Sequence, residues 1–359
     1  MVRILHYIPG FGYGGIETVV LNLCKNVDKK YHFDFLVETE IPDYAKKIIE
    51  EKNGRVIQIP KMTQIKEIGI YFKRLYEIFK KGNYDVFHCH SLDTRPFPMI
   101  FANMFRVKCR IMHIHFNDFN NKKNLFIKKF FLHLGQKNAT SYVACSKRSA
   151  DNILTKKNRE KAIILNNGIS IKKFQYDEKI RKQIRKNLKI DEKTILVGCI
   201  GRLSYLKNQK FVIEITQKLP SNYHVIFLGD GEDKDELKNL VKEKKIKNIV
   251  FVGNVGNVKE YIDACDLVLM PSLSEGMPLT LIELQANGVS AIVSTAIDEE
   301  FIVNSNVIRL NLDINDWLEN IKLIKPERVK PEKLLMGYDI KNVAQLYEKI
   351  ILNNLNSEK

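Results

Sequence analysis

The stretch that decides the fold is residues 266–293, DLVLMPSLSEGMPLTLIELQANGVSAIV. The apolar run at 266–271 is short enough for a buried strand. Pro278 suits the first position of a helix and Gly288 is a typical C-terminal cap, so we expect a helix between them. A second apolar run at 289–293 predicts another strand. Strand, loop, helix and strand in this order indicate an open α/β sheet, which binds its ligands at the carboxyl ends of its strands.

Two acids, Glu275 and Glu283, stand on either side of the predicted helix start. Gly276 lets a ligand approach the backbone closely, and the free N–H groups of Leu279 and Thr280 can hold a phosphate. Glu283 lies roughly 7.5 Å along the helix axis, where it could accept hydrogen bonds from ribose hydroxyls. Glu275 could bind the hydroxyls of a sugar on the other side of the phosphates. The spacing alone also fits two solvated surface acids.

A second Gly-rich stretch follows the predicted first strand, residues 2–8. Its glycines, Gly10-x-Gly12-x-x-Gly15, match a dinucleotide fingerprint in the right strand-to-helix context, and Glu38 could bind the ribose. These residues would suit an NAD(P)-dependent oxidoreductase.

The spacing of Glu275 and Glu283, followed by Ala286-Asn287-Gly288, resembles the E-x7-E element of the retaining GT-B glycosyltransferases of family 4. The resemblance covers nearly the whole chain. It implies an α/β fold with two Rossmann-like, doubly wound domains that face each other across a cleft. It also implies that the donor, a nucleoside-diphosphate sugar and most simply a UDP-sugar, is bound mainly by the second domain.

Other motifs carry the same resemblance and imply further site residues. Arg202 and Lys207, in GRLSYLK at 201–207, match the family's pair that holds the donor pyrophosphate, and an Arg fork with a mobile Lys suits phosphate oxygens. His115 best matches the active-site histidine over the donor sugar and the acceptor, although His113 is an alternative. The resemblance further implies that donor contacts come from Gly14 and Gly15 of a GGxE loop, from Gly253 and its following loop, and from Gly276, Met277, Leu279 and Thr280.

Two His-x-His pairs, His88/His90 and His113/His115, fall at the ends of predicted strands. Each pair shares a strand face, so together they could bind a metal, but no third ligand type clusters nearby. We expect instead one packed and one site-facing histidine in each pair. The acids of Asp233-x-Asp235 spell the DxD of metal-dependent transferases, but they fit a helix start better. We therefore expect neither a metal nor another cofactor.

Length and alternation predict two domains. The resemblance implies that these are an acceptor-side domain at 1–168, joined by a returning helix at 338–354, and a nucleotide-sugar-binding domain at 169–337. Between them, the polar stretch 171–192 is expected to be helical. The six cysteines are scattered singly, which favours reduced, buried thiols in a cytoplasmic protein. No apolar run is long enough for a transmembrane helix.

Charge is unevenly distributed. Residues 1–170 hold 29 Lys and Arg against 15 Asp and Glu, whereas residues 171–359 hold 29 against 27. A basic domain fits an anionic membrane surface, an anionic substrate or nucleic acid, but no recognisable nucleic-acid module is present. The basic, aromatic stretch at 122–134 is either a solvated amphipathic helix or a helix that lies on the inner face of the cell membrane.

The combined motifs favour a retaining hexosyl- or N-acetylhexosaminyltransferase. The resemblance implies that its acceptor is an oligosaccharide linked to a polyprenyl diphosphate, for capsule, exopolysaccharide or another surface glycan. The alternatives are the oxidoreductase that uses Gly10 to Gly15, and a GT-B protein that is not a transferase, either a nucleotide-sugar epimerase or an inactive binding module.

Overall fold

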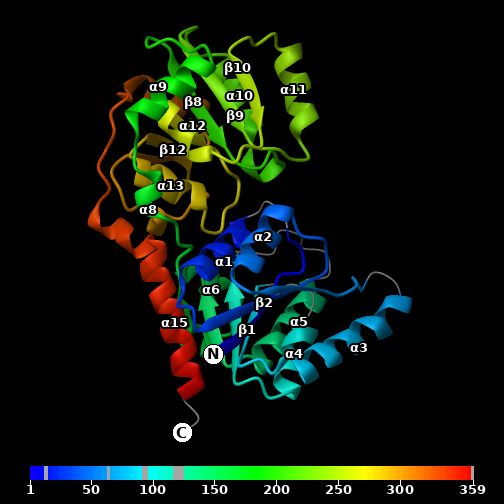
Figure 1. Cartoon of the computed structure of the whole chain (residues 1–359). Helices are drawn as coiled ribbons and strands as arrows, with labels where there is room; N and C mark the ends of the chain where they lie inside the picture. Colours follow the sequence, from blue (N-terminus) through cyan, green and yellow to red (C-terminus); the bar gives the residue numbers. More distant parts are fainter. Residues whose placement is uncertain (12–14, 63–64, 91–95, 116–124, 357–359) are drawn as a thin grey trace. The chain divides into compact units, whose positions relative to one another are not determined.

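The computed structural model of the 359-residue chain describes residues 1–11, 15–62, 65–90, 96–115 and 125–356. The chain forms two compact units (Figure 1). We call them unit 1, which comprises Met1–Ile169 and Tyr338–Lys359, and unit 2, which comprises Ser170–Gly337.

Unit 1 is built on a seven-stranded sheet with the order β3-β2-β1-β4-β5-β6-β7, and every strand pairing is parallel. Its strands are β1 (Val2–Tyr7), β2 (Tyr31–Val37), β3 (Arg55–Gln58), β4 (Val86–Cys89), β5 (Cys109–Ile114), β6 (Ser141–Ala144) and β7 (Ile163–Ile164). Its helices are α1 (Gly15–Asn26), α2 (Asp43–Glu51), α3 (Ile65–Gly82), α4 (Phe97–Met104), α5 (Leu125–Asn138), α6 (Lys147–Ile153), α7 (Lys156–Arg159) and α15 (Ile340–Asn356).

Unit 2 repeats the plan on a six-stranded parallel sheet with the order β10-β9-β8-β11-β12-β13. Its strands are β8 (Ile195–Ile200), β9 (Tyr223–Leu228), β10 (Ile249–Gly253), β11 (Leu267–Met270), β12 (Ser290–Ser294) and β13 (Val307–Leu310). Its helices are α8 (Ile171–Phe174), α9 (Glu178–Asn187), α10 (Gln209–Thr216), α11 (Lys234–Glu243), α12 (Val258–Ala264), α13 (Leu279–Asn287) and α14 (Ile314–Leu323). Short 3₁₀ turns are η1 (Tyr205–Lys207), η2 (Glu299–Phe301) and η3 (Lys333–Tyr338).

Alternation along the strands of unit 1 separates two packed faces. Leu5 and Tyr7 of β1 join the apolar core that includes Tyr71 and Leu75 of α3. The residue between them, His6, points to the opposite face, where its ring stacks on Phe35 with centroids 5.3 Å apart. Successive strand residues point to opposite faces, so the sheet is buried on both sides, as a parallel sheet must be.

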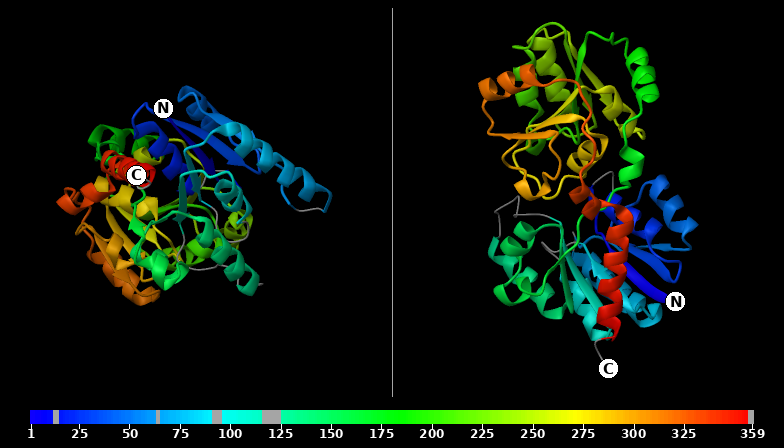
Figure 2. Two further views of the ribbon diagram at one scale, coloured as in Figure 1. Left: turned by 90° about the horizontal axis from the view of Figure 1, so that it is seen from below. Right: turned by 90° about the vertical axis from the view of Figure 1, so that its left-hand side faces the viewer.

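Helix α15 completes unit 1 from the far end of the chain. It packs beside α1 (Figures 1 and 2), and Tyr347 at its centre is fully buried. The backbone N–H of Ile169 donates to the carbonyl of Tyr338 at 2.9 Å, and that of Ile340 donates to the carbonyl of Ile169 at 2.8 Å. Unit 1 is therefore discontinuous in sequence.

Two local expectations differ from the structure. The stretch 171–192 is not one helix: it divides into α8 and α9, because Asp177 caps a new start with its carboxylate, which accepts from Lys179 and Ile180 N–H groups. Pro278 is the N-cap of α13 and not its first residue. At the other end, Gly288 caps α13 with φ +80°, as expected from its lack of a Cβ. Among the described residues, no helix is both long and apolar enough to span a bilayer.

Candidate active site

The candidate site of unit 2 lies where the strand order of this unit reverses, between β8 and β11. Ligands of open α/β sheets bind at such switch points. Arg202 and Lys207 follow β8, and Glu275 follows β11. The loops are tied together, because the Asn208 side chain donates to the Pro271 carbonyl at 3.2 Å and the Leu273 N–H donates to the Leu206 carbonyl at 2.8 Å.

The loop after β8 is also held by the loop after β9. The Leu203 N–H donates to the carbonyl of Asp230 at 3.0 Å. Gly229 has φ +133°, and a Cβ there would lie 2.0 Å from the carbonyl oxygen of Gly201. Only glycine allows this approach, so the backbone that carries Arg202 is fixed by close packing between two loops.

Lys207 and Glu275 form an ion pair across the switch point. The Lys207 side chain is 26% exposed and that of Glu275 is 10% exposed. The hydroxyl of Ser272 donates to the same carboxylate at 2.6 Å. The structure thus brings together a cation suited to phosphate and an acid suited to sugar hydroxyls.

Arg202 is placed differently. Its side chain is 72% exposed and forms an ion pair with Glu232 at 2.8 Å. Gln209 holds the backbone of Arg202, since the side-chain amide of Gln209 donates to the Arg202 carbonyl at 2.9 Å. The guanidinium therefore stands in solvent above a fixed backbone, where it can turn toward an anion.

The amino end of α13 lies in the same segment as Glu275. Leu279 and Thr280 are its first two residues, so their N–H groups have no partner within the helix. Met277, just before the helix, is buried at 6% exposure. Gly276 is partly exposed beside it. Unpaired N–H groups of this kind are suited to a phosphate, and the role predicted for Leu279 and Thr280 stays a prediction.

Glu283 lies one turn further along α13. Its side chain is partly exposed, with buried Ile282 and Leu284 beside it. Burial raises the pKa of Glu283 to about 7, and the positive charge of Lys173 opposes this shift only in part. A carboxyl with such a pKa changes charge near neutral pH, which affects how strongly it accepts hydrogen bonds.

The remaining predicted donor contacts are glycines. Gly253 ends β10 with φ +83°, and a Cβ there would meet nothing within 4 Å. Gly15 begins α1 in unit 1. Gly14 lies outside the described residues.

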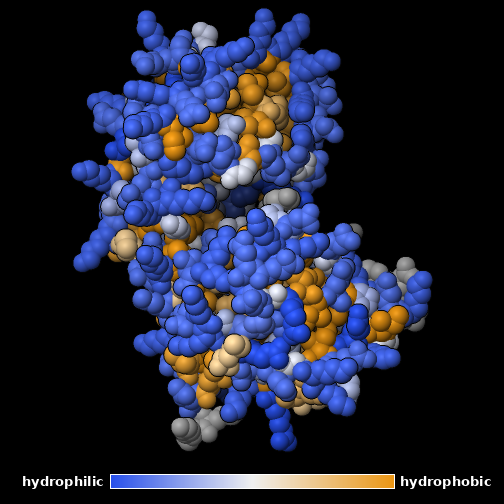
Figure 3. Space-filling view, viewed as in Figure 1, coloured by the Kyte–Doolittle hydropathy of each residue, from blue (hydrophilic) through white to orange (hydrophobic). Residues whose placement is uncertain are grey.

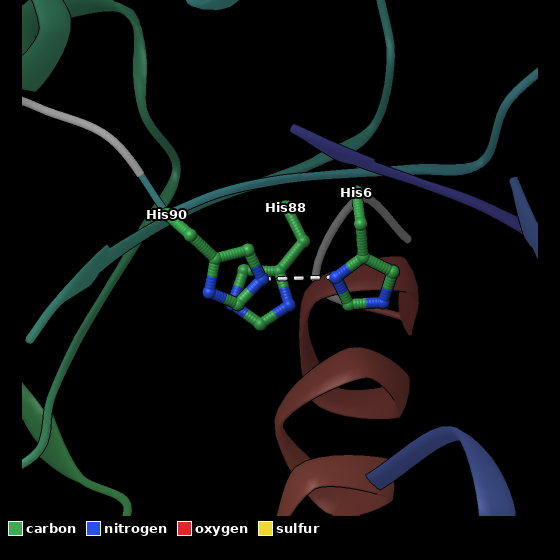
Figure 4. Close-up of side chains that lie close together, drawn as sticks. All are labelled: His6, His88 and His90. Carbon is green, nitrogen blue, oxygen red and sulfur yellow. Dashed lines mark hydrogen bonds between the residues drawn. The ribbon is translucent and has the colours of Figure 1, made fainter. Parts of the chain in front are cut away.

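A separate candidate site is in unit 1, at the switch point between β1 and β4. Five histidines gather there: His6 from β1, His88 and His90 from β4 and its end, and His113 and His115 from β5 and its end. Figure 4 shows three of them, with the hydrogen bond between His6 and His90. We call these five residues the histidine cluster.

The histidine cluster contains two hydrogen-bonded chains. In one, His90 joins His6 at 2.9 Å and His115 at 2.8 Å. In the other, His88 joins the Tyr347 hydroxyl at 2.9 Å and His113 at 3.1 Å. A bond between two neutral imidazoles needs one nitrogen to donate and the other to accept, so each chain fixes the tautomers of its members relative to each other.

Burial keeps the histidine cluster neutral. It lowers the pKa of His6 and of His115 to about 3, since the charged imidazolium would lose its hydration. The pKa values of His88, His90 and His113 are also lowered well below the usual value, first by burial and then by the neighbouring imidazoles.

His115 and its predicted alternative differ in exposure. His113 is 1% exposed and is bonded to His88, whereas His115 is partly exposed at the edge of the cluster. Sequence analysis missed His6 and Tyr347. The signal for His6 was its place near the end of the first strand, which is central in doubly wound sheets. Tyr347 gave no signal, because it lies more than 200 residues from the four histidines of β4 and β5 in the chain.

Glu38, the acid that an oxidoreductase would need for ribose, is already engaged. It is 5% exposed and accepts a hydrogen bond from the Tyr7 hydroxyl at 2.6 Å. The structure therefore offers no accessible ribose acid at this position.

Comparisons with known proteins agree with the geometry. The model of the family described as Glycosyltransferase Family 4 matches residues 13–173, and the model described as Glycosyl transferases group 1 matches residues 180–331. The chain is a glycosyltransferase. The two matches together span both units, and each unit matches a different family model.

Relatives of this glycosyltransferase extend over most of its length. The putative glycosyltransferase EpsF of Bacillus subtilis (strain 168) is 27% identical, with 99% of this chain and 97% of EpsF covered. The UDP-Gal:alpha-D-GlcNAc-diphosphoundecaprenol alpha-1,3-galactosyltransferase of Escherichia coli is also 27% identical, with 78% and 79% covered. The crystal structure of Anabaena Alr3699/HepE in complex with UDP matches with a TM-score of 0.82 at 16% identity, covering 98% of this chain and 100% of that one. The expected GT-B fold is thus confirmed.

Proposed function

We propose that this glycosyltransferase moves a sugar from a UDP-sugar to an oligosaccharide linked to a polyprenyl diphosphate, with retention of anomeric configuration. The observation that carries the proposal is the meeting of Lys207 and Glu275 at the switch point of unit 2, beside the amino end of α13. Such an arrangement offers a positive charge to a diphosphate and a hydrogen-bond acceptor to the hydroxyls of the adjoining sugar.

The roles of the side chains follow from their chemistry. Arg202 and Lys207 bind the pyrophosphate, and the N–H groups of Leu279 and Thr280 add to it. Glu283 accepts from the ribose hydroxyls and Glu275 from the hydroxyls of the donor sugar. Two acids separated by phosphate-binding groups suit a donor in which sugar, diphosphate and ribose follow in that order.

The leaving group is stabilised by the protein's own cations. Lys207 and Arg202 neutralise the charge that develops on the diphosphate as the glycosidic bond breaks, and this needs no metal. We assign His115 to the reacting groups, the backbone of Gly14 and Gly15 to the phosphates, and Gly253, Gly276 and Met277 to the remaining donor contacts. We assign no carboxylate nucleophile, and the leaving phosphate accepts the proton of the acceptor hydroxyl.

The acceptor proposal rests on relatives and on charge. The relative from Escherichia coli is named for a diphosphoundecaprenol acceptor. Residues 1–170 carry an excess of 14 positive charges. A basic surface attracts both an anionic lipid leaflet and a diphosphate, each positive side chain contributing about 1 kcal/mol near such a leaflet. We propose that the product enters capsule, exopolysaccharide or another surface glycan.

Helix α5 of unit 1 is the proposed membrane contact on the inner face of the cell membrane. Phe126 is 84% exposed and Phe130 52% exposed, while Lys129 stands exposed between them. Apolar side chains are also exposed on α3, including Ile70. Figure 3 shows hydrophobic surface on the side of unit 1 where Figure 1 places α3 and α5. Aromatic and basic side chains together are typical of a helix that lies on a bilayer.

The first experiment measures thermal unfolding of the purified protein with UDP-, GDP- and ADP-sugars and with NAD(H) and NADP(H). A ligand at about 100 times its dissociation constant stabilises by about 2.7 kcal/mol. We expect a shift with one UDP-sugar that EDTA does not remove. A shift with nicotinamide cofactors alone would overturn the proposal and return the site to Gly10–Gly15.

A further inference from the structure

The histidine cluster holds five of the eight histidines of the chain on one face of unit 1. The parallel register places His6 directly beside His88, and the next inward-pointing residues along β4 and β5 add the others. Ring centroids of His88 and His90 are 4.0 Å apart, and those of His113 and His115 are 3.9 Å apart. The proposed transfer reaction uses only His115 of these five imidazoles, so it gives the other four no role; His115 belongs to both proposals.

Two groups of three within the cluster bring ring nitrogens close enough to share a metal ion. One ring nitrogen from each of His90, His113 and His115 lies within 4.8 Å of the others, and the same holds for His6, His88 and His90. A zinc ion with Zn–N bonds of about 2.0–2.1 Å and tetrahedral angles needs ligand nitrogens about 3.4 Å apart. Side-chain movements of about 1 Å or less therefore suffice.

Contrary to the expectation from the sequence, we propose that unit 1 binds one divalent transition-metal ion, of the zinc class, through His90, His113 and His115. His90 Nδ1 and His115 Nε2 already face each other at 2.8 Å. His113 Nε2 is buried and has no hydrogen-bond partner among the described residues. A buried nitrogen that meets no donor or acceptor is costly, and a coordinated ion would use its lone pair.

The alternative group, His6, His88 and His90, is less suited to receive an ion. All three side chains are buried, at 0%, 0% and 5% exposure. In the proposed site, His115 is partly exposed, so an ion can enter on its side and keep an open coordination position.

The remaining members of the cluster fit the role of supports. His88 bonds the second nitrogen of His113 at 3.1 Å and is itself bonded to Tyr347, while His6 bonds the second nitrogen of His90 at 2.9 Å. Ligating histidines almost always donate their other N–H in this way, which fixes the ring. The two hydrogen-bonded chains thus orient two of the three proposed ligands.

The ligand set also predicts which ion is bound. Both groups consist of imidazoles alone, and no carboxylate of the described residues belongs to them. Imidazole nitrogen suits Zn²⁺, Cu²⁺ and Ni²⁺, whereas Mg²⁺ and Ca²⁺ need oxygen ligands. The site therefore differs in kind from the metal sites of transferases that hold a diphosphate through carboxylates.

The test uses the full chain, dialysed against a chelator and titrated with Zn²⁺, Co²⁺ and Mg²⁺. We expect one Zn²⁺ per chain, a rise in melting temperature with Zn²⁺ but not with Mg²⁺, and the visible absorption of four-coordinate Co²⁺. His113→Gln and His115→Gln should each weaken Zn²⁺ binding by at least about 10-fold, because each removes a ligand. The control is His133→Gln, on the exposed face of α5, which should bind as the wild type does.

Two results would overturn the proposal. One is the absence of stoichiometric Zn²⁺ binding and of the Co²⁺ absorption in the wild type. The other is unchanged Zn²⁺ binding in His115→Gln. His115 is the most exposed of the three proposed ligands, and circular dichroism can verify that this variant is folded. None of these measurements involves a nucleotide sugar, so they are independent of whether the transferase proposal holds.

Discussion

Lys207 and Glu275 lie in direct ionic contact at the switch point of unit 2, although we assign one to the diphosphate and the other to the donor sugar. The contact means that the carboxylate offsets part of the charge that Lys207 offers to phosphate. Glu275→Gln should therefore bind UDP about as tightly as the wild type or several-fold tighter. Transfer should slow by about 100-fold or more, because the donor sugar loses the carboxylate that accepts its hydrogen bonds.

Removing the cation of the same ion pair provides the comparison with Glu275→Gln. Lys207→Met should lower the affinity for UDP by about 10- to 100-fold, since a charge-assisted hydrogen bond to phosphate is worth about 1.5–3 kcal/mol. Calorimetry with UDP measures both variants and a transfer assay measures turnover. If Glu275→Gln and Lys207→Met weakened UDP binding equally, the two residues would not have the separate roles proposed.

Glu283 gives a pH-dependent prediction for stability. Its pKa is about 7 in the folded chain and near its ordinary value of 4.5 when unfolded, so the folded state binds the proton more tightly. Ionisation therefore costs stability progressively from about pH 4.5 to pH 7, and the full cost is present above pH 7. Glu283→Gln should stabilise the ligand-free protein at pH 8 by roughly 1–3 kcal/mol, a range that allows for partial exposure, and by almost nothing at pH 4.5.

The same substitution should weaken nucleotide binding, because the ionised carboxylate is the stronger acceptor for ribose hydroxyls. UDP affinity should fall more steeply between pH 8 and pH 6 in the wild type than in Glu283→Gln, in which only protonation of the terminal phosphate of UDP near pH 6 remains. Urea unfolding and UDP calorimetry at the two pH values measure both effects. A variant that lost stability at pH 8 would contradict the raised pKa.

Arg202 tests whether an exposed cation contributes to donor binding. Its ion pair with Glu232 lies in solvent, so breaking the pair should leave folding stability almost unchanged. Arg202→Ala should nevertheless weaken UDP binding by about 10-fold or more, because the guanidinium fork is lost. The matched control is Glu232→Gln, which removes the same ion pair but keeps the guanidinium and should preserve affinity. Equal losses in the two variants would assign the effect to the ion pair.

Asp266 is the clearest stability determinant of unit 2. It is 6% exposed and accepts hydrogen bonds from Arg181, from Arg185 at 3.0 Å and from the backbone N–H of Leu196 at 2.8 Å. Asp266→Ala leaves two guanidinium groups without their counter-charge and should cost about 3–5 kcal/mol. The fluorescence of Trp317, the single tryptophan of the chain, reports unfolding of this unit in urea.

The control for Asp266 is Glu236→Gln, which breaks the exposed pair with Lys210 in the same unit. An exposed pair contributes little, so this variant should unfold at nearly the same urea concentration as the wild type. A midpoint for Asp266→Ala close to that of Glu236→Gln would show that the buried network does not stabilise unit 2.

The strands and helices were predictable because their signals are local. The apolar runs of β8 and β11 and the glycine that caps α13 are each readable within about ten residues, and alternation then requires parallel sheets. The break between α8 and α9 was missed, because a capping Asp177 within a charged stretch looks like any other helical acid.

The candidate site was predictable only in part, and the limit is again physical. Arg202, Lys207 and Glu275 belong to motifs, so their positions could be read. The contact between Lys207 and Glu275 depends on how loops 68 residues apart approach each other. The histidine cluster depends on strand order: His6 meets His88 only because β1 pairs with β4, and no local pattern states this pairing.

Helix α5 gives the last prediction, on membrane binding. Phe126 and Phe130 are largely exposed, and burying a Phe side chain in the bilayer interface is worth about 1.5–3 kcal/mol. Phe126→Ser combined with Phe130→Ser should therefore lower binding to vesicles that contain anionic phosphatidylglycerol by at least about 10-fold. The control is Leu323→Ser, a 77% exposed apolar residue of unit 2, which should co-sediment as the wild type does. If the Phe substitutions had no effect, α5 would not be the membrane contact. Equal binding of the wild type to neutral phosphatidylcholine vesicles would contradict an attraction to anionic lipid.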